Sequence, residues 1–146
     1  MKKVIIYTDG ACRGNPGYGG WAAILDYNGL KKEIFGSEKK TTNNRMELTA
    51  VIKAMELLKE PCDLVIYSDS KYFCDAIAKG WAKSWQKKGW RKSDGKLALN
   101  TDLWERLLAL MSTHCLEVKW VKGHAGNADN ERCDFLATKA ADQAIR

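Results

Sequence analysis

The fold is decided by a run near the start of the chain, Lys3-Val4-Ile5-Ile6-Tyr7-Thr8-Asp9, together with a similar run further on, Leu64-Val65-Ile66-Tyr67-Ser68-Asp69. Both runs are apolar and rich in β-branched residues, which predicts buried strands over residues 3–8 and 64–68. A helical pattern separates them, and two strands joined by a helical crossover lie parallel in one sheet. The sequence therefore predicts an α/β protein.

Two further strands are predicted over residues 21–27 and 31–37. The pair Asn28-Gly29 between them is a strong hairpin signal, because both residues can take positive φ. Together with the first run they give three antiparallel strands. The segment Cys12–Gly20 is dense in glycine, and we expect it to form a loop.

Helices are expected in the rest of the chain. Asn43 or Asn44 can cap the first helix, and Pro61 stops it. Residues 116–120 alternate as a strand, and further helices are expected over 71–78, before Gly89, over 102–111 and over 130–144. The order β-β-β-α-β-α-α-α-β-α predicts a mixed five-stranded sheet with helices on both faces, in a single domain spanning residues 1–146.

The composition indicates an ordinary globular protein. The 146 residues are 45% hydrophobic and 29% charged, which excludes a disordered or collagen-like chain. No apolar stretch approaches the ~20 residues of a membrane helix, and Asp9 comes too early for a secretory signal. We expect a cytoplasmic monomer with no membrane association and no obligate protein partner. The five scattered cysteines are expected to be reduced thiols without a metal.

The net charge of +6 is concentrated in one segment, residues 79–96, while basic and acidic residues balance elsewhere. We call this stretch the basic segment, and we expect it to project from a neutral body. Such a projection predicts a polyanionic partner, nucleic acid ahead of an anionic membrane. Its charged residues are Lys79, Lys83, Lys87, Lys88, Arg91, Lys92 and Lys96, against the single acid Asp94.

Carboxylates follow both central strands. If the strands are parallel neighbours, ~4.8 Å apart, Asp9 and Asp69 stand side by side at the edge where α/β sheets bind ligands. Each has another interpretation, since Asp9-Gly10 is a turn pair and Asp69 can cap a helix. The duplication favours a site.

Two more acids belong to the same pattern. Glu47 falls in register with the apolar stripe of the first helix, where a lone carboxylate is costly unless it is paired or binds a metal. A basic neighbour or the helix dipole is the other explanation for Glu47. Asp134 lies at the edge of the stripe in the last helix.

Four converging acids would raise one another's pKa values, and divalent cations remove that conflict. Oxygen ligands select Mg²⁺, with Mn²⁺ as a substitute, and two such ions suit phosphodiester hydrolysis. His124, in a glycine-containing loop before Asp134, could relay a proton near neutrality. An exposed histidine without a role explains His124 equally well.

These residues resemble bacterial type 1 ribonuclease H from end to end. The resemblance rests on Tyr7-Thr8-Asp9-Gly10-Ala11, Thr42-Asn43-Asn44-Arg45-Met46-Glu47-Leu48, Ser68-Asp69-Ser70, and the stretch from Gly123-His124-Ala125-Gly126 to Cys133-Asp134. It implies an endonuclease that cuts the RNA strand of RNA–DNA hybrids, leaving 5′-phosphate and 3′-hydroxyl ends, with little sequence specificity. It assigns two metal ions to Asp9, Glu47, Asp69 and Asp134, and an auxiliary role to His124.

The resemblance also implies substrate contacts. Thr42, Asn43 and Arg45 match positions that hold a phosphate of the DNA strand, and Cys12, Asn15, Asn43 and Asn44 match contacts to the hybrid's minor groove. The basic segment resembles a protrusion of the family that binds the hybrid, through Trp81, Trp85, Lys87, Lys88 and Arg91. Packing against the body is the other interpretation for the two tryptophans. Lys71 and Asp75 depart from the uncharged residues expected at their positions.

Two rival functions remain at this stage. A metal-dependent nuclease or strand-transfer enzyme acting on DNA would share the sheet and the acids, and a non-catalytic module would bind hybrids without cutting them. The phosphate-binding residues and the basic segment disfavour the first rival. The four acids disfavour the second, because clustered negative charge does not help to bind an anion.

Overall fold

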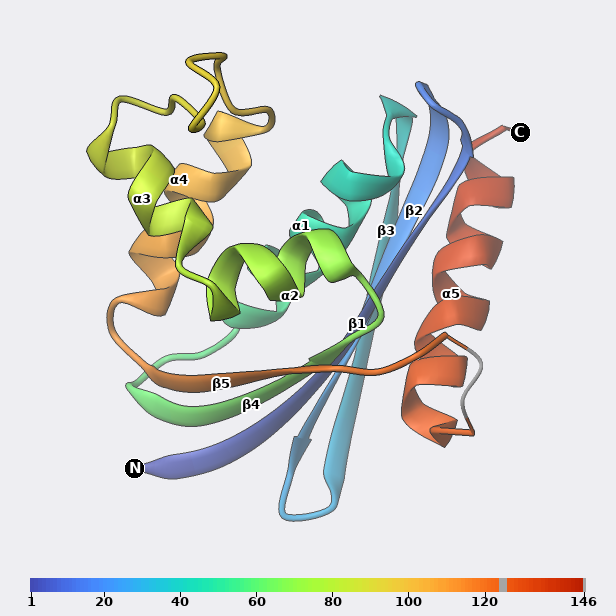
Figure 1. The fold of residues 1–146 in the computed structure, drawn as a ribbon. Helices are drawn as coiled ribbons and strands as arrows, with labels where there is room; N and C mark the ends of the chain where they lie inside the picture. Colours follow the sequence, from blue (N-terminus) through green and yellow to red (C-terminus); the bar gives the residue numbers. More distant parts are fainter. Residues whose placement is uncertain (124–125, 146) are drawn as a thin grey trace.

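A mixed sheet of five strands, in the order β3-β2-β1-β4-β5, forms the centre of the computed structural model (Figure 1). The structure describes residues 1–123 and 126–145. The strands are β1 (Lys2–Gly14), β2 (Gly17–Tyr27), β3 (Leu30–Thr41), β4 (Cys62–Ser68) and β5 (Cys115–Trp120). The helices are α1 (Asn43–Met55), α2 (Lys71–Ala78), α3 (Trp81–Lys87), α4 (Thr101–Met111) and α5 (Ala128–Ala144). The predicted order of elements and the mixed sheet are confirmed.

The two runs that decide the fold pair as predicted. β1 and β4 are parallel, with Tyr7 opposite Tyr67 and their rings stacked 5.3 Å apart between centroids. β1 also pairs with β2, and β2 with β3, in antiparallel fashion. The hairpin at Asn28-Gly29 is present, with φ of 53° and 87°. β1 therefore lies in the middle of the sheet, between one antiparallel and one parallel neighbour.

The glycine-rich segment is not the predicted loop. β1 continues to Gly14 and β2 begins at Gly17, so that only Asn15 and Pro16 separate the two strands. The glycines are needed for close packing rather than for a long loop. A Cβ atom at Gly20 would lie 2.1 Å from the carbonyl oxygen of Ala137, so glycine lets α5 approach β2 closely.

The first helix also differs at both ends from its expected bounds. Its N-cap is Thr42, whose hydroxyl accepts a hydrogen bond from the backbone N–H of Arg45, rather than Asn43 or Asn44. The helix ends at Met55, before the predicted stop at Pro61. After Met55 the backbone forms a tighter turn of the 3₁₀ type, in which the N–H groups of Leu57 and Leu58 donate to carbonyls three residues back.

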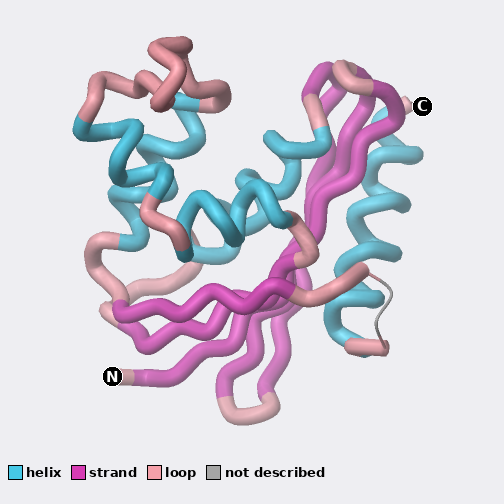
Figure 2. Tube along the Cα trace, in the orientation of Figure 1, coloured by secondary structure: helices cyan, strands magenta, loops and turns pink. Residues whose placement is uncertain are grey.

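Helices cover both faces of the sheet, as Figure 2 shows. α1, α2 and α4 enclose the larger apolar core on one face, and α5 packs over β1–β3 on the other. The smaller core, between α5 and the sheet, consists of small and aliphatic side chains, namely Ala22, Ile24, Cys133, Leu136 and Ala137. Among the helices that the structure describes, none is long and apolar enough to cross a membrane.

The basic segment begins at Lys79, the C-cap residue of α2, and comprises all of α3 and the loop that follows. α3 rests on α4, where the Trp85 and Trp104 rings meet edge to face with centroids 6.2 Å apart. α3 ends at Lys87, near the predicted break at Gly89, which has a φ of 67°. The loop beyond α3 lies at the end of this helix pair farthest from β4 and β5 (Figures 1 and 2).

Candidate active site

The carboxylates of Asp9 and Asp69 follow the paired tyrosines of β1 and β4 by two residues each. Asp9 is 5% exposed, and it stands within β1 rather than in a turn. Asp69 does not cap α2, because Ser70 holds that position and accepts a hydrogen bond from the N–H of Phe73. Neither structural alternative for the two aspartates is therefore supported.

Glu47 is brought to the aspartates by the close approach of α1 to β1. A Cβ atom at Gly10 would lie 2.5 Å from the backbone nitrogen of Glu47, so only glycine allows this spacing. Glu47 is 4% exposed, and its Oε2 atom has no hydrogen-bond partner among the described residues. Asp9, Glu47 and Asp69 each offer a carboxylate oxygen, and these oxygens lie within 4.8 Å of one another.

The cluster is electrostatically unfavourable without a cation. Burial, followed by the charge of Asp69, raises the pKa of Asp9 to about 8, although the N–H of Gly10 donates to its Oδ1 at 2.8 Å. Burial and the charges of Asp9 and Asp69 likewise raise the pKa of Glu47 well above its ordinary value. The neighbours that act on Glu47 are thus acids, which removes the alternative of a basic partner.

Asp134 joins the same cleft from the opposite face of the sheet. It lies on α5, borders a cleft of about 20 Å³ together with Asp9 and Asp69, and its charge helps to raise the pKa of Asp9. Asp134 is outside the group whose oxygens lie within 4.8 Å, so it stands at the rim of the cleft. The other lining residues are Val121, Lys122, Gly123, Asn130 and Glu131.

Asn130 lies at the candidate site, although the sequence patterns assigned it no role. Its Oδ1 atom is buried and has no hydrogen-bond partner in the described part of the chain, and the residue borders the cleft. Asn130 precedes Asp134 by four residues on α5, so the two lie on one face of the helix. That spacing is the signal that could have found it.

His124 lies outside the described residues, and its role remains a prediction. The residue before it, Gly123, borders the cleft, and a Cβ atom at Gly123 would lie 3.3 Å from Oδ2 of Asp69.

The donor set fits a hard divalent cation. Every candidate ligand is a carboxylate oxygen, two of the residues are buried, and one buried oxygen of Glu47 lacks a partner in the part of the chain described. Mg²⁺ and Mn²⁺ prefer oxygen ligands of this kind, whereas zinc favours nitrogen and sulfur.

Three of the four predicted minor-groove contacts lie at or near the start of α1. Because Thr42 is the cap, Asn43 and Asn44 begin the helix and both are exposed. Cys12 lies nearby on β1, with its Sγ atom 3.4 Å from the carbonyl oxygen of Thr41. Asn15 is exposed in the turn between β1 and β2.

Arg45 does not present a free guanidinium at this surface. Its two terminal nitrogens donate to the two carboxylate oxygens of Asp102 at 3.0 and 2.7 Å. The group expected to bind a phosphate is therefore already engaged by a carboxylate.

Most of the predicted contacts in the basic segment share one groove of about 270 Å³. Trp81 is 42% exposed there, whereas Trp85 also packs on Trp104. Packing of Trp85 against the body is therefore confirmed, and its contact with a hybrid stays a prediction. Lys87 lies apart, because it lines a second groove between α2–α3 and α4. The first groove, which we call the aromatic groove, is lined by Trp81, Ser84, Trp85, Lys88, Arg91, Lys92 and Ser93.

The two departures from the family pattern have local partners. The ammonium of Lys71 lies 4.8 Å from the centre of the Trp120 ring, and the indole N–H of Trp120 donates to the carbonyl of Asp69. The carboxylate of Asp75 lies 3.8 Å from the ammonium of Lys79. Asp75 is thus partly neutralised within its own helical turn.

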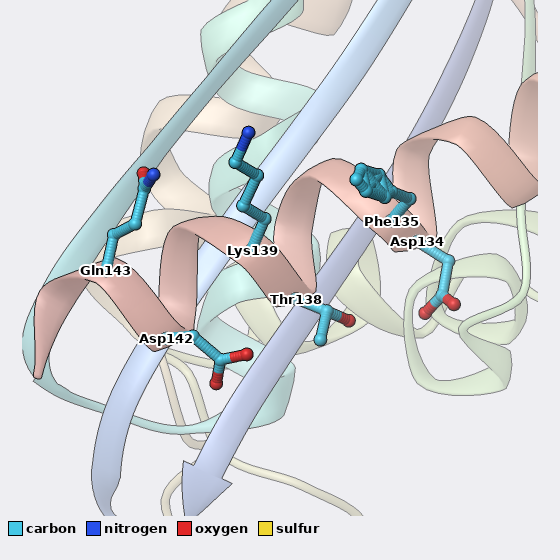
Figure 3. A pocket seen from close by; sticks show the side chains of 6 residues that line it. All are labelled: Asp134, Phe135, Thr138, Lys139, Asp142 and Gln143. Atoms are coloured by element: carbon cyan, nitrogen blue, oxygen red, sulfur yellow. The ribbon is translucent and has the colours of Figure 1, made fainter.

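A further hollow, of about 470 Å³, runs along the outer side of α5 (Figure 3). It is lined by Asp134, Phe135, Thr138, Lys139, Asp142 and Gln143, all from this one helix. Asp142 is held by an ion pair with Arg13 at 2.8 Å. Asp134 is the only residue that this hollow shares with the carboxylate cleft, as far as the described residues show.

Comparisons with known proteins agree with this geometry. A family model described as RNase H matches residues 1–142. A protein of Syntrophus aciditrophicus named Ribonuclease H is 54% identical over 144 residues, covering 99% of this chain and 83% of that protein. The structure of LC9-RNase H1, a type 1 RNase H with the type 2 active-site motif, superposes with a TM-score of 0.87 at 32% identity, covering 99% of this chain and 74% of that one.

A third match is a structure of LC11-RNase H1 in complex with an RNA/DNA hybrid. It has a TM-score of 0.73 at 23% identity and covers 98% of this chain and 99% of that one. At this identity it supports the fold alone.

Proposed function

The chain belongs to the ribonuclease H family, and on that premise we propose that it is a metal-dependent endonuclease that hydrolyses the RNA strand of RNA–DNA hybrids. The observation that carries the proposal is the convergence of Asp9, Glu47 and Asp69 within 4.8 Å, with Asp134 at the rim of their cleft. We further propose that the products carry 5′-phosphate and 3′-hydroxyl ends, and that sequence specificity is low.

Asp9, Glu47, Asp69 and Asp134 would hold two Mg²⁺ ions, with Mn²⁺ as a substitute. When bound, such ions activate a water and stabilise the leaving oxygen in a phosphodiester displacement. Asp9 stands within β1 and Asp69 directly follows β4, and each of these strands is paired on both sides, which fixes where the two charges lie. Glu47 would add a buried oxygen from α1, and Asp134, which is partly exposed, would add a carboxylate from α5.

His124 would take up or release a proton, and thereby assist water activation or product release. Its ordinary pKa lies near neutrality, which suits this task.

Recognition of the hybrid would fall to the surface around the start of α1. The 2′-hydroxyls of the RNA strand lie in a wide, shallow minor groove, and they are the chemical mark that distinguishes RNA from DNA. The amides of Asn15, Asn43 and Asn44 supply donors and acceptors for such a groove, and Cys12 would add contacts through its backbone groups. The Thr42 region would hold a phosphate of the DNA strand.

The aromatic groove would bind the hybrid away from the scissile bond. Lys88 and Arg91 supply positive charge, and Trp81 supplies an exposed ring on which a sugar or base can pack. Because such contacts are made with the phosphate backbone, binding would need no particular sequence.

A cleavage assay on matched duplexes tests this proposal. End-labelled RNA–DNA, RNA–RNA and DNA–DNA duplexes of one sequence are incubated with the protein in Mg²⁺, and in Mg²⁺ with excess chelator. We expect cuts in the RNA strand of the hybrid alone, and none with chelator. Cleavage of DNA–DNA at a similar rate would favour the rival DNA nuclease, and binding without cleavage would favour the non-catalytic module.

A further inference from the structure

We propose that the Arg45–Asp102 ion pair is a positioning element, which fixes the aromatic groove relative to the carboxylate cluster. On this view Arg45 acts through Asp102 and does not contact a phosphate. The inference rests on the proposed function, because it concerns a hybrid that must reach both regions at once.

The ion pair has the geometry of a strong contact. The two terminal nitrogens of Arg45 donate to the two oxygens of Asp102 at 3.0 and 2.7 Å, which is the two-bond arrangement that guanidinium and carboxylate groups favour. One of these nitrogens also donates to Oδ1 of Asn100 at 3.3 Å. The Arg45 side chain is 32% exposed and the Asp102 side chain 64% exposed, so the pair is shielded from solvent on the Arg45 side alone.

The pair joins two elements that serve different parts of the site. Arg45 stands two residues before Glu47 on α1, and Asp102 lies in the first turn of α4. α4 in turn carries Trp104, which packs against Trp85 of α3, a wall of the aromatic groove. Any shift of α4 relative to α1 would therefore move the groove relative to the carboxylates.

A strained residue at the same junction supports this interpretation. Asn100 has a φ of 61°, in the left-handed region, and it stands at the N-cap of α4 without a side-chain capping bond. Its side chain instead accepts from Arg45 and donates to the hydroxyl of Tyr72 on α2, which also accepts from the indole N–H of Trp104. Strained backbone of this kind persists where the surroundings over-determine it. α1, α2 and α4 thus meet in one hydrogen-bonded network around Arg45.

The two roles for Arg45 predict opposite effects when Asp102 is removed. If Arg45 binds a phosphate, Asp102 competes with the substrate, and Asp102→Ala should strengthen hybrid binding. If the pair positions the groove, the same substitution should weaken binding, although it removes a negative charge. The sign of the change in KM separates the roles.

The experiment uses the full chain with Asp102→Ala, Arg45→Ala, both together, and the charge swap Arg45→Asp with Asp102→Arg. Steady-state cleavage is measured on a series of hybrids of increasing length. For the parent, kcat/KM should rise at the length where a hybrid reaches the aromatic groove. We expect each single variant to lose that rise, with KM about fivefold higher on long hybrids and kcat unchanged. The double variant should be no worse than either single one, and the swap should restore much of the loss.

Asp94→Asn is the matched control, since it removes an acid of the basic segment whose hydrogen bond, among the described residues, is accepted from the N–H of Lys96 in its own loop. It should not raise KM. Thermal unfolding of each variant checks that the fold persists, and Arg45→Lys, which keeps the charge but not the two-bond geometry, should resemble Arg45→Ala.

Three results would overturn the proposal: a lower KM for Asp102→Ala, equal losses on short and long hybrids, or a swap that binds worse than either single variant. If the parent fails to cleave hybrids, the proposed function is wrong. Binding of intact hybrids by the same variants then still decides between the two roles of Arg45.

Discussion

Replacing Asp9 by asparagine should stabilise the protein when no metal is present. The substitution keeps the size of the side chain and removes a buried negative charge beside Asp69 and Glu47. Asp9 has a pKa of about 8 in the folded protein, against 3.8 ordinarily. Because the folded-state pKa is the higher one, stability is fully present below the unfolded value and is lost as the pH rises from about 4 to about 8.

The size of the effect follows from the same values. Each pKa unit corresponds to about 1.36 kcal/mol, so ionising Asp9 in the folded protein costs at most roughly 6 kcal/mol above pH 8. The amide of asparagine must still be buried, and it can lose the hydrogen bond from Gly10. We therefore expect a net gain of about 2–4 kcal/mol at pH 8.5, or roughly 6–12 °C in Tm.

Urea and thermal unfolding of the parent and of Asp9→Asn measure this gain in EDTA at pH 4 and at pH 8.5. The gain should be large at the higher pH and small at the lower one. Added Mg²⁺ should stabilise the parent more than the variant, because it neutralises the charge that the variant lacks. The reasoning fails if the variant is no more stable than the parent at pH 8.5, or if the gain is the same at both pH values.

Three other variants test separate parts of the account. Lys88→Gln and Arg91→Gln together should lower the log–log salt slope of hybrid binding by about 1.5–2, since both residues line the aromatic groove. Lys87→Gln, on the second groove, should lower the slope less than either of these substitutions does. An equal change for Lys87→Gln would contradict the assignment of hybrid binding to the aromatic groove. His124→Ala should slow cleavage by about 10²-fold without abolishing it, and a complete loss would refute an auxiliary role. Gly20→Ala should lower the free energy of unfolding by about 3 kcal/mol, because its Cβ would meet backbone atoms of α5 at 2.1 and 2.5 Å; unchanged stability in urea would count against that packing argument.

The sequence predicted the sheet and the acid cluster because both depend on patterns that are local or repeated. The runs ending at Asp9 and Asp69 share composition and length, and parallel pairing of such runs leaves little choice of register. Glu47 could be placed from helical periodicity alone. These three positions therefore follow from the sequence alone.

Glycine and capping residues were harder to assign. Gly10 and Gly20 are of the residue type that is common in turns and loops, but each of them lets a helix pack closely against a strand. Nothing in the local sequence distinguishes a glycine needed for a turn from a glycine needed for packing. Thr42, rather than an asparagine, caps α1, since several suitable residues stand in a row there. Tertiary packing decides which glycine allows a close approach and which residue caps the helix.

Contacts between distant residues lay beyond the sequence patterns. Arg45 and Asp102 are 57 positions apart, and their ion pair depends on how α4 settles against α1. The separation of Lys87 from Lys88 by the two sides of α3 likewise appears only in three dimensions.

The central claim is that clustered carboxylates hold the ions that drive RNA cleavage, and a Mg²⁺ titration of hybrid cleavage by the parent and by Asp69→Asn tests it most directly. We predict that the parent's rate rises from none in chelator to a plateau, and that the variant is slower by about 10²- to 10³-fold or more at every Mg²⁺ concentration. A variant that follows the parent's curve, or a parent that cleaves at full rate in chelator, would contradict the account.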